Sequence, residues 1–123
     1  MIQIHVFEYR FKNGEMKAVG EKWVFQPPSE LPEWRYDDGS RVFVIFAYNK
    51  GQKKDDAVIE ADFSPCIIKG WKIYHLEKVR LDEGGMINDR KASFSVKGLE
   101  KNERQRIDIL VKGPMEKVKI EVK

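Results

Sequence analysis

Short apolar segments separated by turn residues run along the whole chain. They are rich in Val, Ile, Phe, Tyr and Trp and recur at intervals of roughly 10 to 15 residues, as the strands of an all-β domain do. The 3.6-residue period of an amphipathic helix is hard to find, so no helix is expected that could connect parallel strands. The pattern predicts an all-β fold of eight or nine antiparallel strands in a two-sheet β-sandwich, with a closed β-barrel as the alternative.

The N-terminal pattern predicts a hairpin with an irregular first strand. Over residues 2–11 the apolar positions change face, from the even-numbered positions up to Val6 to the odd-numbered positions from Phe7 onward. This change predicts a β-bulge or a change of sheet partner between those two residues. Asn13-Gly14 tolerates positive φ and predicts a tight turn into a second strand over 16–25.

The remaining strands are predicted over residues 41–49, 58–63, 67–81, 92–96, 107–111 and 118–122. The first of these is apolar on both faces, which predicts a central strand and the most buried element. Gly70 divides the third into two strands or one bent strand, and Glu83-Gly84-Gly85 is expected to end it. In the last two, apolar residues alternate with charged ones, so each is expected to bury one face and expose the other.

The length and hydropathy of the chain fit a single domain over residues 1–123. At 14.4 kDa and 41% hydrophobic residues, such a chain buries roughly two thirds of its unfolded surface. Its longest apolar run, 42–48, is far shorter than the roughly 20 residues of a membrane-spanning helix, so no membrane insertion is expected. As printed, no signal leader precedes the first strand, which predicts a cytoplasmic protein, or an extracellular one if the sequence has been trimmed.

Charged residues make up 35% of the chain, and their richness in Lys and Glu predicts a thermophilic source. Residues 1–62 carry nine basic against eleven acidic residues, hence −2, and residues 63–123 carry fourteen against nine, hence +5. Because the two signs alternate along the chain, a solvated surface is favoured and nucleic acid is an unlikely partner. Exposed sheet edges would also allow a homodimer.

Residues capable of catalysis or metal binding are few and scattered. Cys66 is the single cysteine, and its pairing with His75 as nucleophile and base lacks a third group. His5 lies far from both in the sequence. Asp37-Asp38-Gly39 and Asp55-Asp56 offer too few oxygen ligands for calcium and are explained by turn geometry. We therefore expect no enzyme, no cofactor and no metal site.

The connection over residues 26–40 is longer than most strand connections. Its three prolines, Pro27, Pro28 and Pro32, favour an extended conformation and remove backbone donors, so it cannot form an inner strand. The segment must therefore lie on the outside of the sandwich.

Side chains typical of binding hot spots follow these prolines. Trp34, Arg35 and Tyr36, with Arg41 shortly after, predict a protein-binding site. In the alternative interpretation, Trp34 or Leu31 folds back to plug one end of the sandwich and the prolines shield a sheet edge. Both interpretations stay open at this stage. The other two tryptophans, Trp23 and Trp71, are predicted in the core, with Trp71 as the central sandwich tryptophan.

Several landmarks between residues 41 and 123 occur in a familiar order. They are the Asn49-Lys50-Gly51 turn, Phe63-Ser64-Pro65, Gly70-Trp71, Phe94-Ser95-Val96, and Gly98 to Glu103 ahead of the strand 106–111. This order resembles the CARDB-type immunoglobulin-like modules, which are appended to adhesion and surface proteins. The resemblance implies an immunoglobulin-like β-sandwich with a non-catalytic role in attachment or spacing.

The sequence thus predicts a non-catalytic protein-interaction or adhesion-like module that binds an unknown protein partner. Binding would use the proline-rich connection or an exposed sheet edge, to which a partner strand can add. The alternative is a domain for glycan or single-stranded nucleic acid, since aromatic residues stand beside arginines and the C-terminal half is basic.

Overall fold

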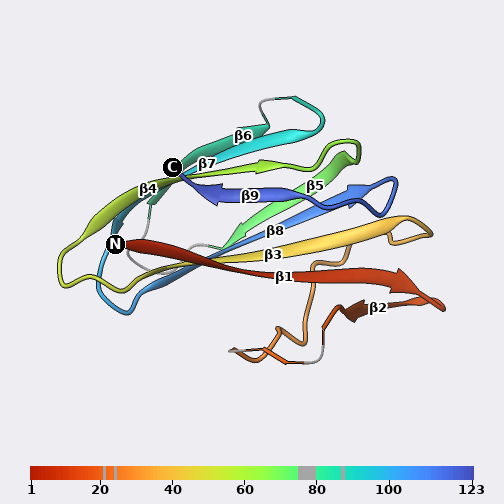
Figure 1. Cartoon of the computed structure of the whole chain (residues 1–123), viewed down its shortest axis with the longest axis horizontal. Helices are drawn as coiled ribbons and strands as arrows, with labels where there is room; N and C mark the ends of the chain where they lie inside the picture. Colours follow the sequence, from red (N-terminus) through yellow and green to blue (C-terminus); the bar gives the residue numbers. More distant parts are fainter. Residues whose placement is uncertain (21, 24, 75–79, 87) are drawn as a thin grey trace.

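The chain folds into two antiparallel sheets packed face to face, a β-sandwich that is not closed into a barrel (Figure 1). The computed structural model describes residues 1–20, 22–23, 25–74, 80–86 and 88–123, with 80–86 as backbone only. Within these ranges one sheet has the order β2-β1-β3-β8-β5 and the other β6-β7-β4-β9. The strands are β1 (Ile2–Lys12), β2 (Glu15–Ala18), β3 (Ser40–Asn49), β4 (Asp55–Asp62), β5 (Ile67–Tyr74), β6 (Arg80–Met86), β7 (Lys91–Leu99), β8 (Arg104–Lys112) and β9 (Lys119–Val122).

The main hydrophobic core lies between the two sheets. Alternate residues of β3 and β8, including Ile45 and Ile109, face alternate residues of β4 and β7, including Ile59 and Phe94. All four are almost fully buried. This arrangement follows from the two-residue period of a strand, which sends every second side chain to the same face.

A second, smaller core covers the opposite side of the five-stranded sheet, called here its outer face. Phe7, Tyr9, Val42, Val44 and Leu110 form it, and side chains of the proline-rich connection pack against them. The central strand β3 is therefore buried on both faces, which confirms the prediction for residues 41–49.

The two cores explain the change of apolar face in β1. No bulge or change of partner occurs, because β1 pairs with β3 in continuous register from Ile2 to Arg10, so that prediction was wrong. Ile4 and Val6 face the four-stranded sheet, whereas Phe7 and Tyr9 belong to the second core on the outer face. The sequence pattern changes where the layer covering the strand changes.

The predicted hairpin turn is confirmed, but the second strand is shorter than predicted. Asn13 and Gly14 both have positive φ, 53° and 80°, as a tight two-residue turn requires. The strand β2 ends at Ala18 instead of continuing to residue 25. Trp23, beyond its end, is 40% exposed, so its predicted place in the core was wrong.

Residues 67–81 contribute to two strands in different sheets, β5 and β6, one of the two alternatives that the sequence left open, but Gly70 lies inside β5 and does not divide them. The register of β5 against β8 shifts between Ile68 and Gly70. β6 continues through Glu83-Gly84-Gly85 to Met86, so these residues do not end the strand as predicted. Trp71 is 41% exposed and is not the central tryptophan, because β5 is an edge strand.

β8 also differs from the sequence prediction. Both of its faces are buried, including the face that carries Asp108. The alternation of apolar and charged residues predicted that this face is exposed to solvent, but the proline-rich connection covers it. β9, in contrast, has half-buried apolar residues and a charged edge. Among the parts of the chain that the structure describes, no helix is long and apolar enough to span a membrane.

Removal of the Phe63 ring tests the core between the sheets. This ring is fully buried and packs 5.3 Å, centroid to centroid, from that of Phe43. Phe63→Ala should lower the free energy of unfolding by about 3–5 kcal/mol, measured by urea denaturation. Val19→Ala, at an exposed site, is the control and should change it by less than about 0.5 kcal/mol. A loss below about 1 kcal/mol for Phe63→Ala would contradict this packing.

Candidate functional site

The structure divides the four predicted binding residues between two places. Trp34 and Tyr36 are half-buried on the outer face, and Arg35 between them is exposed. Arg41 is only 2% exposed and belongs to the side of β3 that faces the second sheet. The four residues therefore do not form one surface, and a shared role in binding a partner stays untested.

Residues 26–36, called here the strap, lie against the outer face and form no strand. Side chains of the sheet bind two of its carbonyl oxygens: Tyr9 Oη donates to Pro28 O at 2.6 Å, and Arg106 Nη2 donates to Glu30 O at 2.8 Å. Within the strap, the Tyr36 hydroxyl donates to Pro32 O. These bonds give hydrogen-bond donors to carbonyl groups that lie outside the strand ladders.

The strap also inserts side chains into the second core. Leu31, Trp34 and Tyr36 pack against it. The Trp34 indole lies over Gly70, where an added Cβ would come within 3.3 Å of Trp34 Nε1. The strap folds back, as one of the two sequence interpretations held, but it covers a face of the sheet and does not plug an end of the sandwich.

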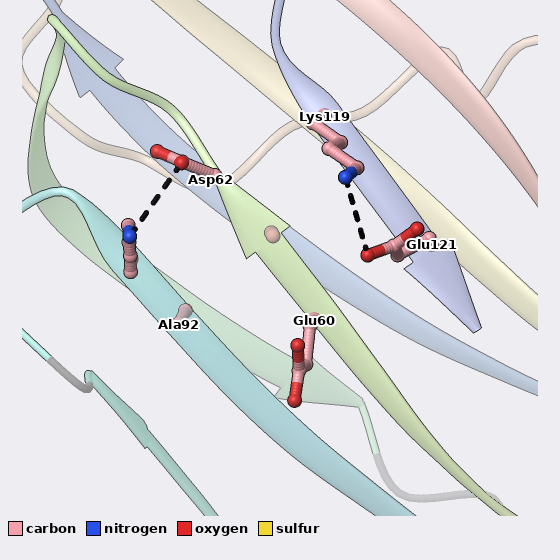
Figure 2. A pocket seen from close by; sticks show the side chains of 7 residues that line it. Glu60, Asp62, Ala92, Lys119 and Glu121 are labelled. Carbon is pink, nitrogen blue, oxygen red and sulfur yellow. Dashed lines mark ion pairs between the residues drawn. The ribbon is translucent and has the colours of Figure 1, made fainter. Parts of the chain in front are cut away.

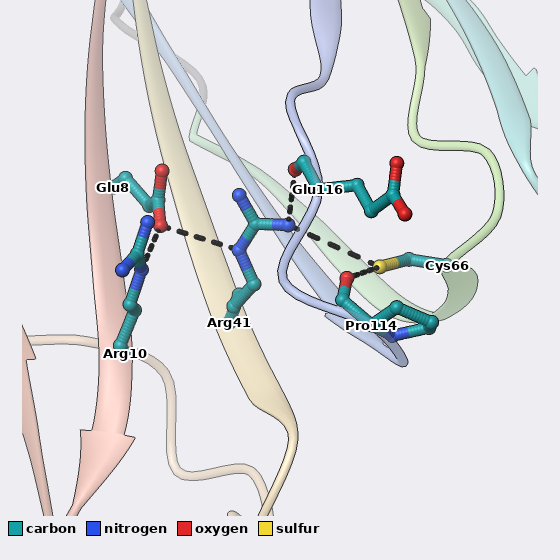
Figure 3. Close-up of polar contacts among 6 residues, drawn as sticks. All are labelled: Glu8, Arg10, Arg41, Cys66, Pro114 and Glu116. Carbon is teal, nitrogen blue, oxygen red and sulfur yellow. Dashed lines mark hydrogen bonds and ion pairs between the residues drawn. The ribbon is translucent and has the colours of Figure 1, made fainter.

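Arg41 lies in a polar cluster at one end of the space between the sheets (Figure 3). Its Nε donates to Glu8 Oε2 at 3.2 Å and its Nη1 to the carbonyl of Glu116 at 2.9 Å. The Cys66 thiol lies 3.9 Å from the same Nη1 and donates to Pro114 O at 3.0 Å. A buried guanidinium is tolerated here because its N–H groups and its charge have partners. The cluster joins β1, β3 and the connection before β9.

Glu8 is the carboxylate that compensates the charge of Arg41. Burial on its own would raise the pKa of Glu8, but hydrogen bonds and charge attraction from Arg41 and Arg10 outweigh burial, and the pKa is lowered from its ordinary value of 4.5. The folded state therefore favours the ionised form. This contribution to stability is present above the unfolded-state pKa and is lost as the pH falls through the lowered folded-state value.

Under the strap lies a second polar group that sequence reasoning missed. Asp108 is fully buried, yet it accepts two hydrogen bonds from Arg106, from Nε and Nη2 at 2.8 Å each, and one from Tyr74 Oη at 3.0 Å. Burial raises the pKa of Asp108, although these hydrogen bonds act in the opposite direction. The group aligns Arg106, which in turn holds the strap.

A groove of about 400 Å³ opens between the strap and the edge strand β5. Trp34 and Arg35 line it, so two of the predicted residues do meet at one concave surface. Its cations are Arg35, Lys69 and Lys112, and its carboxylate, Asp37, lies 2.8 Å from Lys112 Nζ. The lysines were missed because they come from β5 and β8, whose position next to the strap depends on the sheet order.

The outside of the four-stranded sheet carries a smaller hollow of about 140 Å³ among β4, β7 and β9 (Figure 2). Each of its carboxylates has a lysine partner: Asp62 pairs with Lys91 at 3.8 Å, Glu121 with Lys119 at 3.7 Å, and Glu60 with Lys123 at 3.7 Å. Alternating surface ion pairs of this kind contribute little stability and protect an edge strand from unwanted pairing.

The residues considered for catalysis are not brought together in the part of the chain that can be described. Cys66 is fully buried, and its proposed partner His75 lies outside the described residues. His5 packs edge-on against the Phe7 and Phe25 rings. In the described ranges, no three His, Cys, Asp or Glu residues lie close enough to hold a metal ion. The predicted absence of an enzymatic activity and of a cofactor stays a prediction.

Comparison with known proteins gives no relative: no family model, no curated protein and no solved structure matches this chain.

The role of the strap can be tested at Trp34. Trp34→Ala should lower the free energy of unfolding by about 1–3 kcal/mol, because it uncovers the sheet around Gly70 and removes a half-buried indole. Arg35→Ala, at the exposed neighbouring residue, should change it by less than about 0.5 kcal/mol. Urea denaturation measures both. Equal stability of wild type and Trp34→Ala would mean that the indole does not anchor the strap.

Replacement of Glu8 tests the charge pair. Glu8→Gln should be about 1.5–3 kcal/mol less stable than wild type at pH 7, because Arg41 loses its charged acceptor. The difference in free energy of unfolding between the two proteins should become smaller as the pH falls below 4.5, because protonation of Glu8 then removes the same charge from the wild-type protein. Urea denaturation at a series of pH values measures it. Glu15→Gln, which removes an exposed charge paired with Lys17, is the control. If Glu8→Gln remained less stable than wild type by the same amount at acid pH, the stabilising role of the Glu8–Arg41 charge pair would be contradicted.

Proposed function

We propose that this protein is a non-catalytic protein-interaction module that binds an extended, acidic segment of a partner along the edge strand β5. The observation that carries the proposal is the cationic groove beside β5, which Trp34, Arg35, Lys69 and Lys112 line. A strand added to β5 would form backbone hydrogen bonds with the sheet and lay alternate side chains beside this groove.

β5 is the edge most suited to such an addition. It has eight residues, whereas the other edge of the same sheet, β2, has only four. The loop at Asp89 already binds the N–H of Ile68 at 2.7 Å, and within the described residues the only strand that pairs with residues 69–74 is β8, on the other side of β5. Trp71, within it, exposes an aromatic side chain of the kind enriched in binding hot spots.

The charges of the groove indicate the chemistry of the partner. Three cations face one carboxylate, and Asp37 already pairs with Lys112. The excess positive charge of Arg35 and Lys69 favours acidic side chains in the added strand. The resemblance of residues 41–123 to CARDB-type immunoglobulin-like modules supports the same kind of role, because such modules serve attachment without catalysis.

Peptide selection tests the proposal. Peptides selected on the immobilised protein from a random phage-displayed library should be extended and rich in Asp and Glu. The double variant Arg35→Glu, Lys69→Glu should weaken their binding at least about tenfold in fluorescence anisotropy, or about 1.4 kcal/mol. The matched control Lys101→Glu, Lys117→Glu reverses two exposed charges elsewhere and should change it less than about twofold.

Hydrogen exchange locates the bound peptide. Bound peptide should slow exchange of the amides in residues 69–74, since strand addition gives them hydrogen-bond partners. The proposal would be overturned if bound peptide protected the amides of another edge strand. It would also be overturned if the double variant Arg35→Glu, Lys69→Glu bound the selected peptides as tightly as wild type. Protection of the same amides in concentrated protein without peptide, together with a dimer in size-exclusion chromatography, would replace the partner with a second copy of the chain.

A further inference from the structure

The strap covers one part of the outer face. The adjoining part, where Phe25 packs edge-on against His5 and Tyr48, carries an ordered set of aromatic and basic side chains. The β1, β3, β8 and β5 strands lie side by side in this sheet. Their register brings the outward side chains into two adjacent rows: His5, Phe46, Arg106 and Tyr74 in one, and Gln3, Tyr48 and Arg104 in the other.

Aromatic rings and cations are in contact across these rows. The Arg104 guanidinium lies 5.6 Å from the Phe46 ring centroid, and that of Arg106 lies 4.4 Å from the Tyr74 centroid. Lys72 Nζ lies 4.7 Å from the Tyr74 centroid and Lys50 Nζ 5.8 Å from that of Tyr48. These distances are typical of cation–π pairs, and they hold flat surfaces and positive charge together.

The positive charge on this part of the face is mostly exposed. Lys50, Lys72 and Arg104 are solvent-accessible, whereas Arg106 is paired with the buried Asp108 beneath it. Acidic residues of the strap, Glu30 and Glu33, lie at the border of the face and not within the two rows. A polyanion would therefore be attracted to the rows and repelled at the strap.

A hollow of about 190 Å³ lies within the rows, lined by Phe46, Tyr74, Arg104 and Arg106. A second hollow of about 410 Å³ continues it toward the strap, past Lys72 and Leu31. Flat rings and planar guanidinium groups around a hollow suit a flat, unpaired base, because bases stack on both kinds of surface.

We infer that this part of the outer face binds single-stranded nucleic acid. Two or three successive bases stack on Phe46, Tyr48 and Tyr74 and on the guanidinium planes between them. The phosphates lie near Arg104, Lys72 and Lys50. A single strand is specified because a duplex keeps its bases stacked inside and presents only phosphates to a sheet face. A polyanion is favoured over a glycan because the exposed charged groups Lys50, Lys72 and Arg104 are all cations.

The groove of the proposed function lies beyond Trp34 and the strap, although both surfaces use β5, whose Lys72 and Tyr74 belong to this site. The inference therefore does not depend on the protein-binding role. The double variant Arg35→Glu, Lys69→Glu should leave oligonucleotide binding within about twofold of wild type. The two proposals can fail independently of each other.

The test uses a labelled oligothymidylate and oligouridylate of about 12 nucleotides in fluorescence anisotropy. Wild-type protein should bind at low salt, with an affinity that falls as salt increases. Arg104→Glu should weaken binding about tenfold or more, because it reverses the exposed guanidinium over Phe46. Lys101→Glu, a nearby exposed charge reversal outside the rows, should weaken it less than about twofold.

Stacking is tested separately from charge. Tyr48→Leu should weaken binding about fivefold or more, whereas Tyr48→Phe, which keeps the ring, should restore it to within about twofold. Ultraviolet cross-linking followed by mass spectrometry should map the bound strand to Phe46, Tyr48 or Tyr74. Urea denaturation of each variant verifies that it is folded.

Several results would overturn the inference. They are no binding at low salt, equal weakening by Arg104→Glu and Lys101→Glu, or cross-links confined to other parts of the chain. Displacement of the oligonucleotide by an equal charge of polyglutamate would show a site for acidic protein segments. Displacement by an equal amount of duplex DNA would show phosphate binding without stacking.

Discussion

The structure depends on the need of the five-stranded sheet to bury both of its faces. β3 and β8 carry apolar side chains on each side, and a two-layer sandwich covers only one of them. The strap provides the third layer, with Leu31 and Trp34 over the sheet and its carbonyl groups bound by Tyr9 and Arg106. Without it, the side chains of Val42, Val44 and Leu110 would face water. A segment without regular secondary structure thus covers the outer face, as a third sheet would.

The strap also determines what the outer face can do. Where it lies, the face is apolar, closed and bordered by acidic residues. Beside it, half-buried rings of β3 and β5 contact the cations Lys72 and Arg104, which are exposed. Arg106 links the two parts, since its Nη2 donates both to the buried Asp108 carboxylate and to the Glu30 carbonyl of the strap. The two proposed binding surfaces are therefore consequences of where one covering segment ends.

Much of the fold could be predicted from the sequence, because strand positions, the Asn13-Gly14 turn and the central place of residues 41–49 are properties of local pattern. The failures have one physical origin: alternation tells which side of a strand is apolar, but not which layer covers it. The polar side of β8 was therefore assigned to solvent although Asp108 is buried, and the face change at Val6 was attributed to a bulge. Trp71 was placed in the core because its edge position depends on the sheet order.

The candidate site was predicted less well than the fold, because residues that are neighbours in the sequence were assumed to be neighbours in space. Arg41 points away from Trp34, while Arg104 meets Tyr48 only through a strand register that no local pattern encodes.

The absence of a side chain at Gly70 has a spectroscopic consequence. It lets the Trp34 indole lie against the sheet, whereas the other two tryptophans, Trp23 and Trp71, are about two-fifths exposed to water. The fluorescence of Trp34 therefore reports whether the strap is packed against the sheet. The emission of Trp34 differs between a chain whose strap packs against the sheet and a chain whose strap has detached while both sheets remain folded.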